Sequence, residues 1–299
     1  MSSGRSSRKS WGEMAPRGRP FLKMHGLQNH FIIVDGRSDP WQPGEEEIVR
    51  WCDVRRGIGA DQLVVVEKPS VEGKAGGAVA FVRFWNVDGR EAEACGNATR
   101  CVAWLLLEEG GSNEVHLETR MGVLTCRRIG ALRVSTGMGR ISTDWRVIPL
   151  SRQVDTCHLD LQHGPLKDPI ALNIGNPHVV FFVKDVDSID LETLAPPIQE
   201  NPLFPEQVNV GVAQMLSESS MRLRVYERGA GLTMACGSGA CVAAFAALAR
   251  GLTDSRKMTV QLPGGDLDIE ILADGSAVMT GPVEFCFSGN LGTVTLDRV

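Results

Sequence analysis

Apolar residues in this chain gather in two long runs and several short ones. The long runs, 96–107 and 237–249, are apolar on nearly all sides, a pattern typical of helices buried in the centre of a core. The short runs are rich in β-branched and aromatic residues and predict strands. They span residues 31–35, 62–67, 78–85 and 222–227. Each half of the chain therefore predicts an α/β unit, rich in strands, wrapped around one buried helix.

The two predicted units are copies of one another. Residues 83–95 recur as residues 224–236 at a constant offset of 141 positions. Upstream, residues 26–35 and 175–185 share a glycine, a polar turn, a histidine and an apolar run that ends in Asp. Two copies are too few to stack as a solenoid. The repeat instead predicts two pseudo-symmetric domains from an ancient duplication, with the two helix N-termini facing each other across a cleft.

The length of the chain also favours two domains, because 299 residues exceed the usual size of a single core. We expect an N-terminal domain over 21–140 and a C-terminal domain over 141–284. Residues 1–20 are polar and show no periodic pattern, so we expect them to form a disordered tail.

Charge and hydropathy restrict the partners. A net charge of −5 provides no basic stripe for a phosphate backbone, which argues against nucleic acid and favours a small-molecule substrate. No apolar run reaches the ~18 to 20 residues that a membrane span needs, and the N-terminal segment has no secretory signal. We therefore expect a cytoplasmic protein without membrane contact.

The chain has eight cysteines, which the cytoplasm would keep as free thiols. Cys95 and Cys101 point in different directions around their helix, as do Cys236 and Cys241, and no histidine lies nearby in sequence. We therefore expect no metal site. The other six cysteines are interpreted as buried apolar residues. They are Cys52, Cys101, Cys126, Cys157, Cys241 and Cys286.

Cys95 and Cys236 differ from the rest because each lies at the start of a long apolar helix and is followed by glycine. The positive end of the helix dipole is expected to lower the pKa of each thiol towards neutrality. The backbone N–H groups of the next residues can hold a carboxylate. These residues are Gly96, Asn97, Gly237 and Ser238.

Two such thiols on opposite sides of one carbon suit the inversion of an amino-acid α-carbon. One thiolate removes the proton from one face, and the opposite thiol delivers a proton to the other face. This chemistry requires no cofactor. A single Cys-Gly turn is more often a tight turn than a base, but two copies in register favour the catalytic interpretation.

The motifs KMHGLQNHF, FWNVDGREAEACGNATRC, GNPH and ERGAGLTMACGSGAC occur in this order. Together they resemble the diaminopimelate epimerase family over residues 21 to 290. The resemblance implies a pyridoxal-independent isomerase that interconverts LL- and meso-diaminopimelate, in the biosynthesis of lysine and peptidoglycan precursors. It also implies a homodimer, a substrate site between the domains, and a C-terminal strand at about 285–299 that returns to the first domain.

The resemblance also assigns roles to individual residues. It implies that Cys95 and Cys236 are the proton-transfer pair and that His178 and Glu227 tune the pKa values of the two thiols. Arg228 would hold the distal carboxylate of the substrate, and Glu227 would also contact it. The remaining implied substrate contacts are neutral amides, which suit a substrate with two ammonium and two carboxylate groups. They are Asn29, Gln62, Asn86, Asn176 and Asn209.

Four positions depart from the family pattern. Gln28 and Ala98 replace glycines, His30 replaces an aspartate, and Leu232 replaces a glutamate. Two alternatives therefore stay open. One is a racemase of the same fold that acts on another amino acid, such as histidine or proline. The other is a non-catalytic thiol or metal-binding protein, which would exchange no α-proton of any amino acid.

Overall fold

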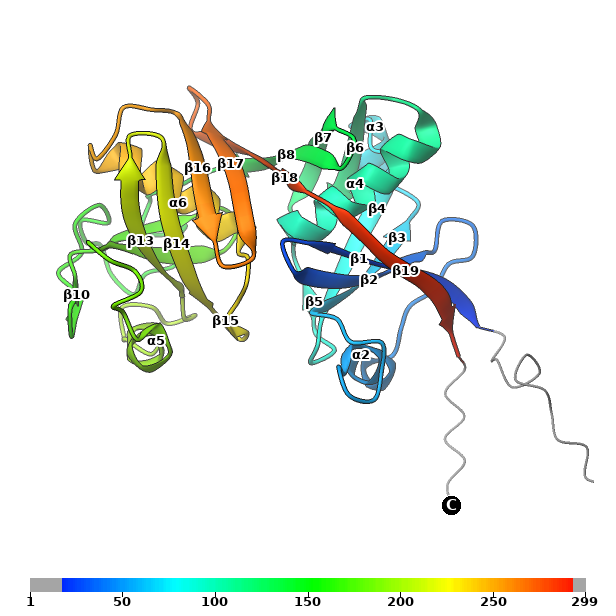
Figure 1. Cartoon of the computed structure of the whole chain (residues 1–299), viewed down its shortest axis with the longest axis horizontal. Helices are drawn as coiled ribbons and strands as arrows, with labels where there is room; N and C mark the ends of the chain where they lie inside the picture. Colours follow the sequence, from blue (N-terminus) through cyan, green and yellow to red (C-terminus); the bar gives the residue numbers. More distant parts are fainter. Residues whose placement is uncertain (1–17, 293–299) are drawn as a thin grey trace, which may run out of the picture.

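The computed structural model describes residues 18–292, which form two strand-rich lobes side by side, each with one long helix inside (Figure 1). Strand β1 begins at Arg19. Residues 19 and 20 therefore belong to the first sheet and not to a tail, and the rest of the predicted tail, 1–17, lies outside the described residues. Within 18–292, no helix combines the length and the apolar character that a membrane crossing requires.

Seven strands of the first half pair in the order β1–β2–β3–β4–β6–β7–β8, with the β2–β3 and β4–β6 pairs parallel and the others antiparallel. The bounds of these strands are β1 Arg19–Gly26, β2 Asn29–Asp35, β3 Gln62–Glu67, β4 Ala80–Asn86, β6 Glu114–Thr119, β7 Gly122–Gly130 and β8 Arg133–Arg140. A two-residue strand, β5 (Glu91–Ala92), adds to β4.

The second half repeats this arrangement as β11–β12–β13–β14–β16–β17–β18, with the β12–β13 and β14–β16 pairs parallel. The bounds are β11 Ile170–Asn173, β12 Pro177–Phe182, β13 Asn209–Ser217, β14 Ser220–Glu227, β16 Lys257–Leu262, β17 Gly265–Ile271 and β18 Ser276–Pro282. Strand β15 (Gly231–Leu232) adds to β14 as β5 adds to β4. Because order and direction agree strand by strand, the predicted duplication is confirmed.

The two long helices occupy equivalent places. Helix α4 (Gly96–Gly110) follows β5, and helix α6 (Gly237–Ala249) follows β15. Each packs against most strands of its own half, as the all-round apolar pattern predicts. In α6 the side chains are small: Ala240, Ala243 and Ala247 are fully buried, which lets the strands approach closely on all sides.

Three shorter helices lie outside these cores. Helix α2 (Glu45–Cys52) packs its apolar face on the outer side of β2 and β3, and α5 (Leu191–Gln199) covers β13 in the same way. Helix α3 (Val71–Ala75) joins β3 to β4. A separate hairpin of β9 (Gln162–His163) and β10 (Leu166–Lys167) precedes β11.

The two halves are joined by strand pairing as well as by side chains. Strand β8 pairs antiparallel with β18, from Arg133 opposite Pro282 to Arg140 opposite Ser276. The last strand, β19 (Glu284–Leu291), returns to the first half and pairs antiparallel with β1 (Figure 1). The described strands of both halves, apart from the β9–β10 hairpin, therefore belong to one hydrogen-bonded system.

Candidate active site

Cys95 and Cys236 cap the N-termini of α4 and α6, each with an extended backbone, at φ −147° and −114° respectively. The glycines that follow are required by packing. A Cβ at Gly96 would lie 2.7 Å from Cε of Met279, and a Cβ at Gly237 would lie 2.7 Å from Sδ of the same methionine. The two helix N-termini therefore approach one shared, fully buried side chain from either side.

A side chain from the first half connects the two helix ends. Nδ2 of Asn97, in the first turn of α4, donates to Oδ1 of Asn29 and to the backbone oxygen of Ala235, both at 3.2 Å. Oδ1 of Asn29 also lies 3.9 Å from Sγ of Cys95. Since Ala235 directly precedes Cys236, one amide fixes the position of one thiol segment relative to the other.

The Cys236 thiol lies within a hydrogen-bonded group. The N–H of Gly239 donates to its Sγ at 3.4 Å, and Oγ of Ser238 lies 3.5 Å away. The carboxylate of Glu227 raises the pKa of this thiol. Thr233 Oγ1 donates to that carboxylate at 2.5 Å, which holds it in place.

Burial raises the pKa of both thiols, to about 12 for Cys95 and well above the ordinary value for Cys236. The predicted lowering by the helix N-termini was wrong in direction for this closed arrangement. Backbone N–H groups of the first turns do lower the pKa of each thiol, but the loss of water outweighs them, and the charge of Glu227 opposes them. In this closed arrangement the protonated thiol is therefore favoured at both positions.

His178 is buried beneath the second helix N-terminus. Its Nε2 lies 3.0 Å from Oδ1 of Asn176, 3.1 Å from Oγ of Ser238 and 3.5 Å from Nδ2 of Asn209. Burial and, to a lesser extent, the charge of Arg228 lower the pKa of His178 to about 3, so the imidazole is neutral near pH 7. It reaches Cys236 only through Ser238, which touches both groups.

Two more amides predicted from the sequence lie together on β3 and β4. Gln62 Nε2 donates to Oδ1 of Asn86 at 2.9 Å, and the two residues are direct partners in the strand register. Oε1 of Gln62 is buried and has no hydrogen-bond partner among the described residues. This oxygen can accept a hydrogen bond from an ammonium group.

Arg228 follows β14 directly. Its backbone N–H donates to Oδ1 of Asn209 at 2.8 Å, and Nη1 donates to the backbone oxygen of Glu206 at 2.8 Å. Neither bond uses a carboxylate, so the guanidinium keeps its capacity for an anionic group of a ligand.

Three side chains of this region were not predicted from the sequence: Met279, Met138 and Arg100. Met138 also lies against Gly96, with its Cε 2.9 Å from a Cβ built there. Methionines in strands have no distinctive signal. Arg100 does have a recognisable sequence signal, because it is a charged residue inside an otherwise apolar helical run.

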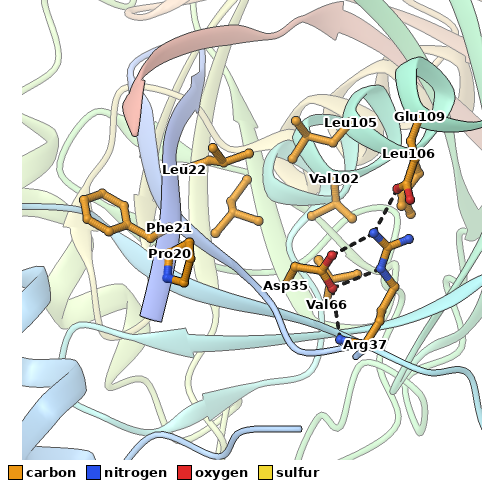
Figure 2. Close-up of a pocket in the computed structure, with 11 residues that line it drawn as sticks. Pro20, Phe21, Leu22, Asp35, Arg37, Val66, Val102, Leu105, Leu106 and Glu109 are labelled. Carbon is orange, nitrogen blue, oxygen red and sulfur yellow. Dashed lines mark hydrogen bonds and ion pairs between the residues drawn. The ribbon is translucent and has the colours of Figure 1, made fainter. Parts of the chain in front are cut away.

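A cavity with a mostly apolar lining lies elsewhere, between β1, β2 and α4, with a volume of about 250 Å³ (Figure 2). At one side of it Arg37 donates to Asp35 and to Glu109. None of the site residues predicted from the sequence lines this cavity.

All eight cysteines are free thiols. Five of the six predicted to be buried and apolar were assigned correctly or nearly so, since Cys52, Cys101, Cys126 and Cys241 are buried and Cys157 is half-buried. The prediction was wrong for Cys286, which is exposed because β19 presents this face to solvent.

The departures from the family pattern have distinct structural effects. Gln28 adopts φ 63° in the β1–β2 turn, a left-handed conformation that favours glycine. Ala98 is buried within α4, and Leu232 packs with the outer apolar cluster around Tyr226. His30 donates its backbone N–H to Oδ2 of Asp61 at 2.6 Å. Its ring packs edge to face against the ring of His25 on β1.

A family model described as diaminopimelate epimerase matches residues 21–143 and 170–286. The diaminopimelate epimerase of Phenylobacterium zucineum is 48% identical over 93% of this chain and 99% of its own length. That of Rhodospirillum centenum is 45% identical over 93% of this chain and 94% of its own length.

Among solved structures, a probable proline racemase from Agrobacterium radiobacter has a TM-score of 0.67 at 15% identity, covering 94% of both chains. A hydroxyproline epimerase from Agrobacterium vitis has the same score and identity, covering 93% of both chains. At this identity the likeness shows the two-domain fold alone.

Proposed function

Because this chain belongs to the diaminopimelate epimerase family, we propose that Cys95 and Cys236 are the two proton-transfer groups of its isomerase activity. The reaction interconverts LL- and meso-2,6-diaminopimelate. The observation that carries the assignment is the position of the thiols, each at the N-cap of a buried helix, with both helix ends in contact with Met279.

In this proposal one cysteine enters the reaction as thiolate and the other as thiol. The thiolate removes the α-proton from one face of the substrate, and its sulfur becomes a thiol. The negative charge that develops on the α-carbon spreads into the adjacent carboxylate, where the N–H groups at the starts of α4 and α6 stabilise it. The opposite thiol then donates its proton to the other face and becomes the thiolate.

Glu227 and His178 act on this exchange from the Cys236 side. The carboxylate of Glu227 favours the protonated sulfur of Cys236, because a nearby negative charge opposes a second one. His178 stays neutral and orients Ser238, which in turn contacts Sγ of Cys236. Both residues are therefore proposed to set the thiol–thiolate balance.

Polar groups around the thiols suit the rest of the substrate. The unpaired Oε1 of Gln62 can accept a hydrogen bond from an ammonium group. The side-chain amides of Asn29 and Asn176 can accept from an ammonium group or donate to a carboxylate. The guanidinium of Arg228 is proposed to bind the distal carboxylate. Asn86 and Asn209 position Gln62 and Arg228 through the hydrogen bonds described above.

The two alternatives left open by the sequence receive less support. The proline racemase and hydroxyproline epimerase structures share only the fold with this chain, at 15% identity. The diaminopimelate epimerases share 45% to 48% identity over nearly the whole length of both proteins. Membership of an enzyme family also disfavours the non-catalytic thiol protein.

We further propose that the enzyme serves lysine and peptidoglycan precursor synthesis in the cytoplasm, without a cofactor. The free thiols support a reducing compartment.

We also propose a homodimer. Two large aromatic side chains on β19, Phe285 and Phe287, are 51% and 46% exposed, which is more apolar surface than a strand facing only water usually carries.

The decisive experiment incubates the purified protein with LL-diaminopimelate in deuterated water. The proposal expects deuterium at the α-carbon and accumulation of the meso isomer. The same incubation with L-proline and with L-histidine tests the racemase alternative. Exchange into either of these amino acids but not into diaminopimelate would reject the proposed substrate, and exchange into none would reject the reaction.

A further inference from the structure

Arg100 lies on α4, five residues after Cys95, and is fully buried. Its Nη1 donates to Sδ of Met279 at 3.4 Å. Its Nε and Nη2 are also buried and have no hydrogen-bond partner among residues 18–292. Within the same residues it forms no ion pair with a carboxylate.

An unpaired guanidinium in a protein core is costly, because the charge loses its hydration and gains no counter-ion. An apolar side chain of similar size would pack at this position with less cost. The contribution of Arg100 to folding therefore does not account for its presence.

The surrounding backbone nevertheless accommodates the side chain. A Cβ at Gly26 on β1 would lie 3.0 Å from Nη2 of Arg100, and a Cβ at Gly281 on β18 would lie 3.0 Å from its Cζ. A glycine on each side thus leaves the space that the guanidinium fills. The two strands come from the two halves of the fold, so Arg100 lies at their junction.

The ionisable groups near Arg100 are mostly thiols. Cys95 and Cys101 on α4 and Cys241 on α6 favour the charged guanidinium when ionised, whereas Arg133 on β8 opposes it. Conversely, Arg100 favours the thiolate of Cys95, while Glu227 on β14 disfavours it. Of these thiols, the proposed function gives a reason for ionisation only to Cys95.

We propose that Arg100 is a positioning residue that supplies the counter-charge for the Cys95 thiolate, and that its bond to Met279 holds this charge behind the two helix N-termini. The inference rests on the proposed function. Arg100 touches no substrate and transfers no proton.

The internal repeat makes the arrangement asymmetric. Cys241 follows Cys236 by five residues, as Arg100 follows Cys95, so the second helix carries a neutral thiol where the first carries a cation. The Glu227 carboxylate instead raises the pKa of Cys236. The proposal therefore assigns the first thiolate of the reaction to Cys95 and the thiol to Cys236.

The test measures the rate of iodoacetamide alkylation at Cys95 against pH, by peptide mapping of the intact purified enzyme. Arg100→Met and Arg100→Gln remove the charge, and Arg100→Lys keeps it. In both neutral variants the alkylation midpoint should rise by about one pH unit or more. The midpoint in Arg100→Lys should stay closer to wild type. Arg222→Met removes a surface arginine paired with Asp187 and should leave the midpoint unchanged.

The melting temperature separates this role from a structural one. Arg100→Met should melt no lower than wild type while its kcat falls about tenfold. A folded neutral variant with an unmoved midpoint would overturn the inference, and so would a failure of both neutral variants to fold. Alkylation needs no turnover, so a shifted midpoint without deuterium exchange in the wild type would reject the proposed function separately.

Discussion

Asn97 in the first turn of α4 donates a hydrogen bond of 3.2 Å to the backbone oxygen of Ala235, the residue before Cys236. The same amide nitrogen holds Asn29, whose oxygen lies beside Cys95. One short side chain thus links the segments that carry both thiols, across the junction of the two halves. Any opening that separates the halves here must break this bond.

Replacing Asn97 by Ala removes both hydrogen bonds and leaves the oxygen of Ala235 without this donor. Because a buried unpaired group costs about 1–3 kcal/mol, the free energy of unfolding should fall by about that amount. kcat should fall as well, since the spacing of the thiols is no longer fixed. Urea unfolding and steady-state kinetics on the same preparation check both expectations, and unchanged kcat would show that the bond does not position the thiols.

The cysteine variants test the assignment of the proton-transfer pair. Cys95→Ala and Cys236→Ala should each abolish epimerisation, because loss of either partner stops turnover whatever the other does. Cys101→Ala and Cys241→Ala are matched controls in the same two helices, and should stay active with about 1 kcal/mol lost from packing. A Cys95→Ala enzyme that still forms the meso product would contradict the two-thiol mechanism.

Glu227→Gln tests the tuning of Cys236. The carboxylate raises the pKa of this thiol, so the neutral amide should lower it. Glu227 also raises the pKa of Cys95, so both limbs of the bell-shaped rate profile should move to lower pH. The measurement is kcat/KM from pH 5 to pH 10 for both proteins. If the two profiles superimpose after scaling, Glu227 has no tuning role.

His178 should make the enzyme sensitive to acid. Its pKa is about 3 in the fold and about 6.5 in the unfolded chain, so only the unfolded chain takes up the proton between these values. Stability therefore falls as the pH drops below 6.5. Between pH 7.5 and pH 5 the loss from this group is about 2 kcal/mol. Urea unfolding of His178→Gln should show a loss smaller by that amount, and parallel curves for the two proteins would argue against a neutral buried imidazole.

The β1–β2 turn offers a stabilising substitution. Leu27 and Gln28 have φ 55° and 63°, as in the two-residue hairpin turns that favour glycine. Gln28→Gly should raise the free energy of unfolding by about 1 kcal/mol and the melting temperature by about 2–4 °C. Gln28→Ala is the control, since alanine keeps the strain and should give no gain. Equal melting temperatures for the glycine variant and wild type would show that the turn is unstrained.

The sequence allowed the repeat, the central helices and the position of both capping cysteines to be predicted, because these depend on local composition and on spacing. It did not allow the pKa direction of the thiols to be predicted. That direction depends on how completely the strands of both halves exclude water from Cys95 and Cys236, which no local pattern records. Met279 was missed for the same reason, since its role comes from two glycines far away in sequence.

The pairing of β19 with β1 has a consequence for the order in which the molecule is made. During synthesis β1 leaves the ribosome first among the described strands, and β19 leaves it last, more than 250 residues later. The second half contains all its own strands before then, whereas one edge of β1 stays open until Glu284–Leu291 emerges. The earlier half therefore gains its last strand only after the strands of the later half have been made.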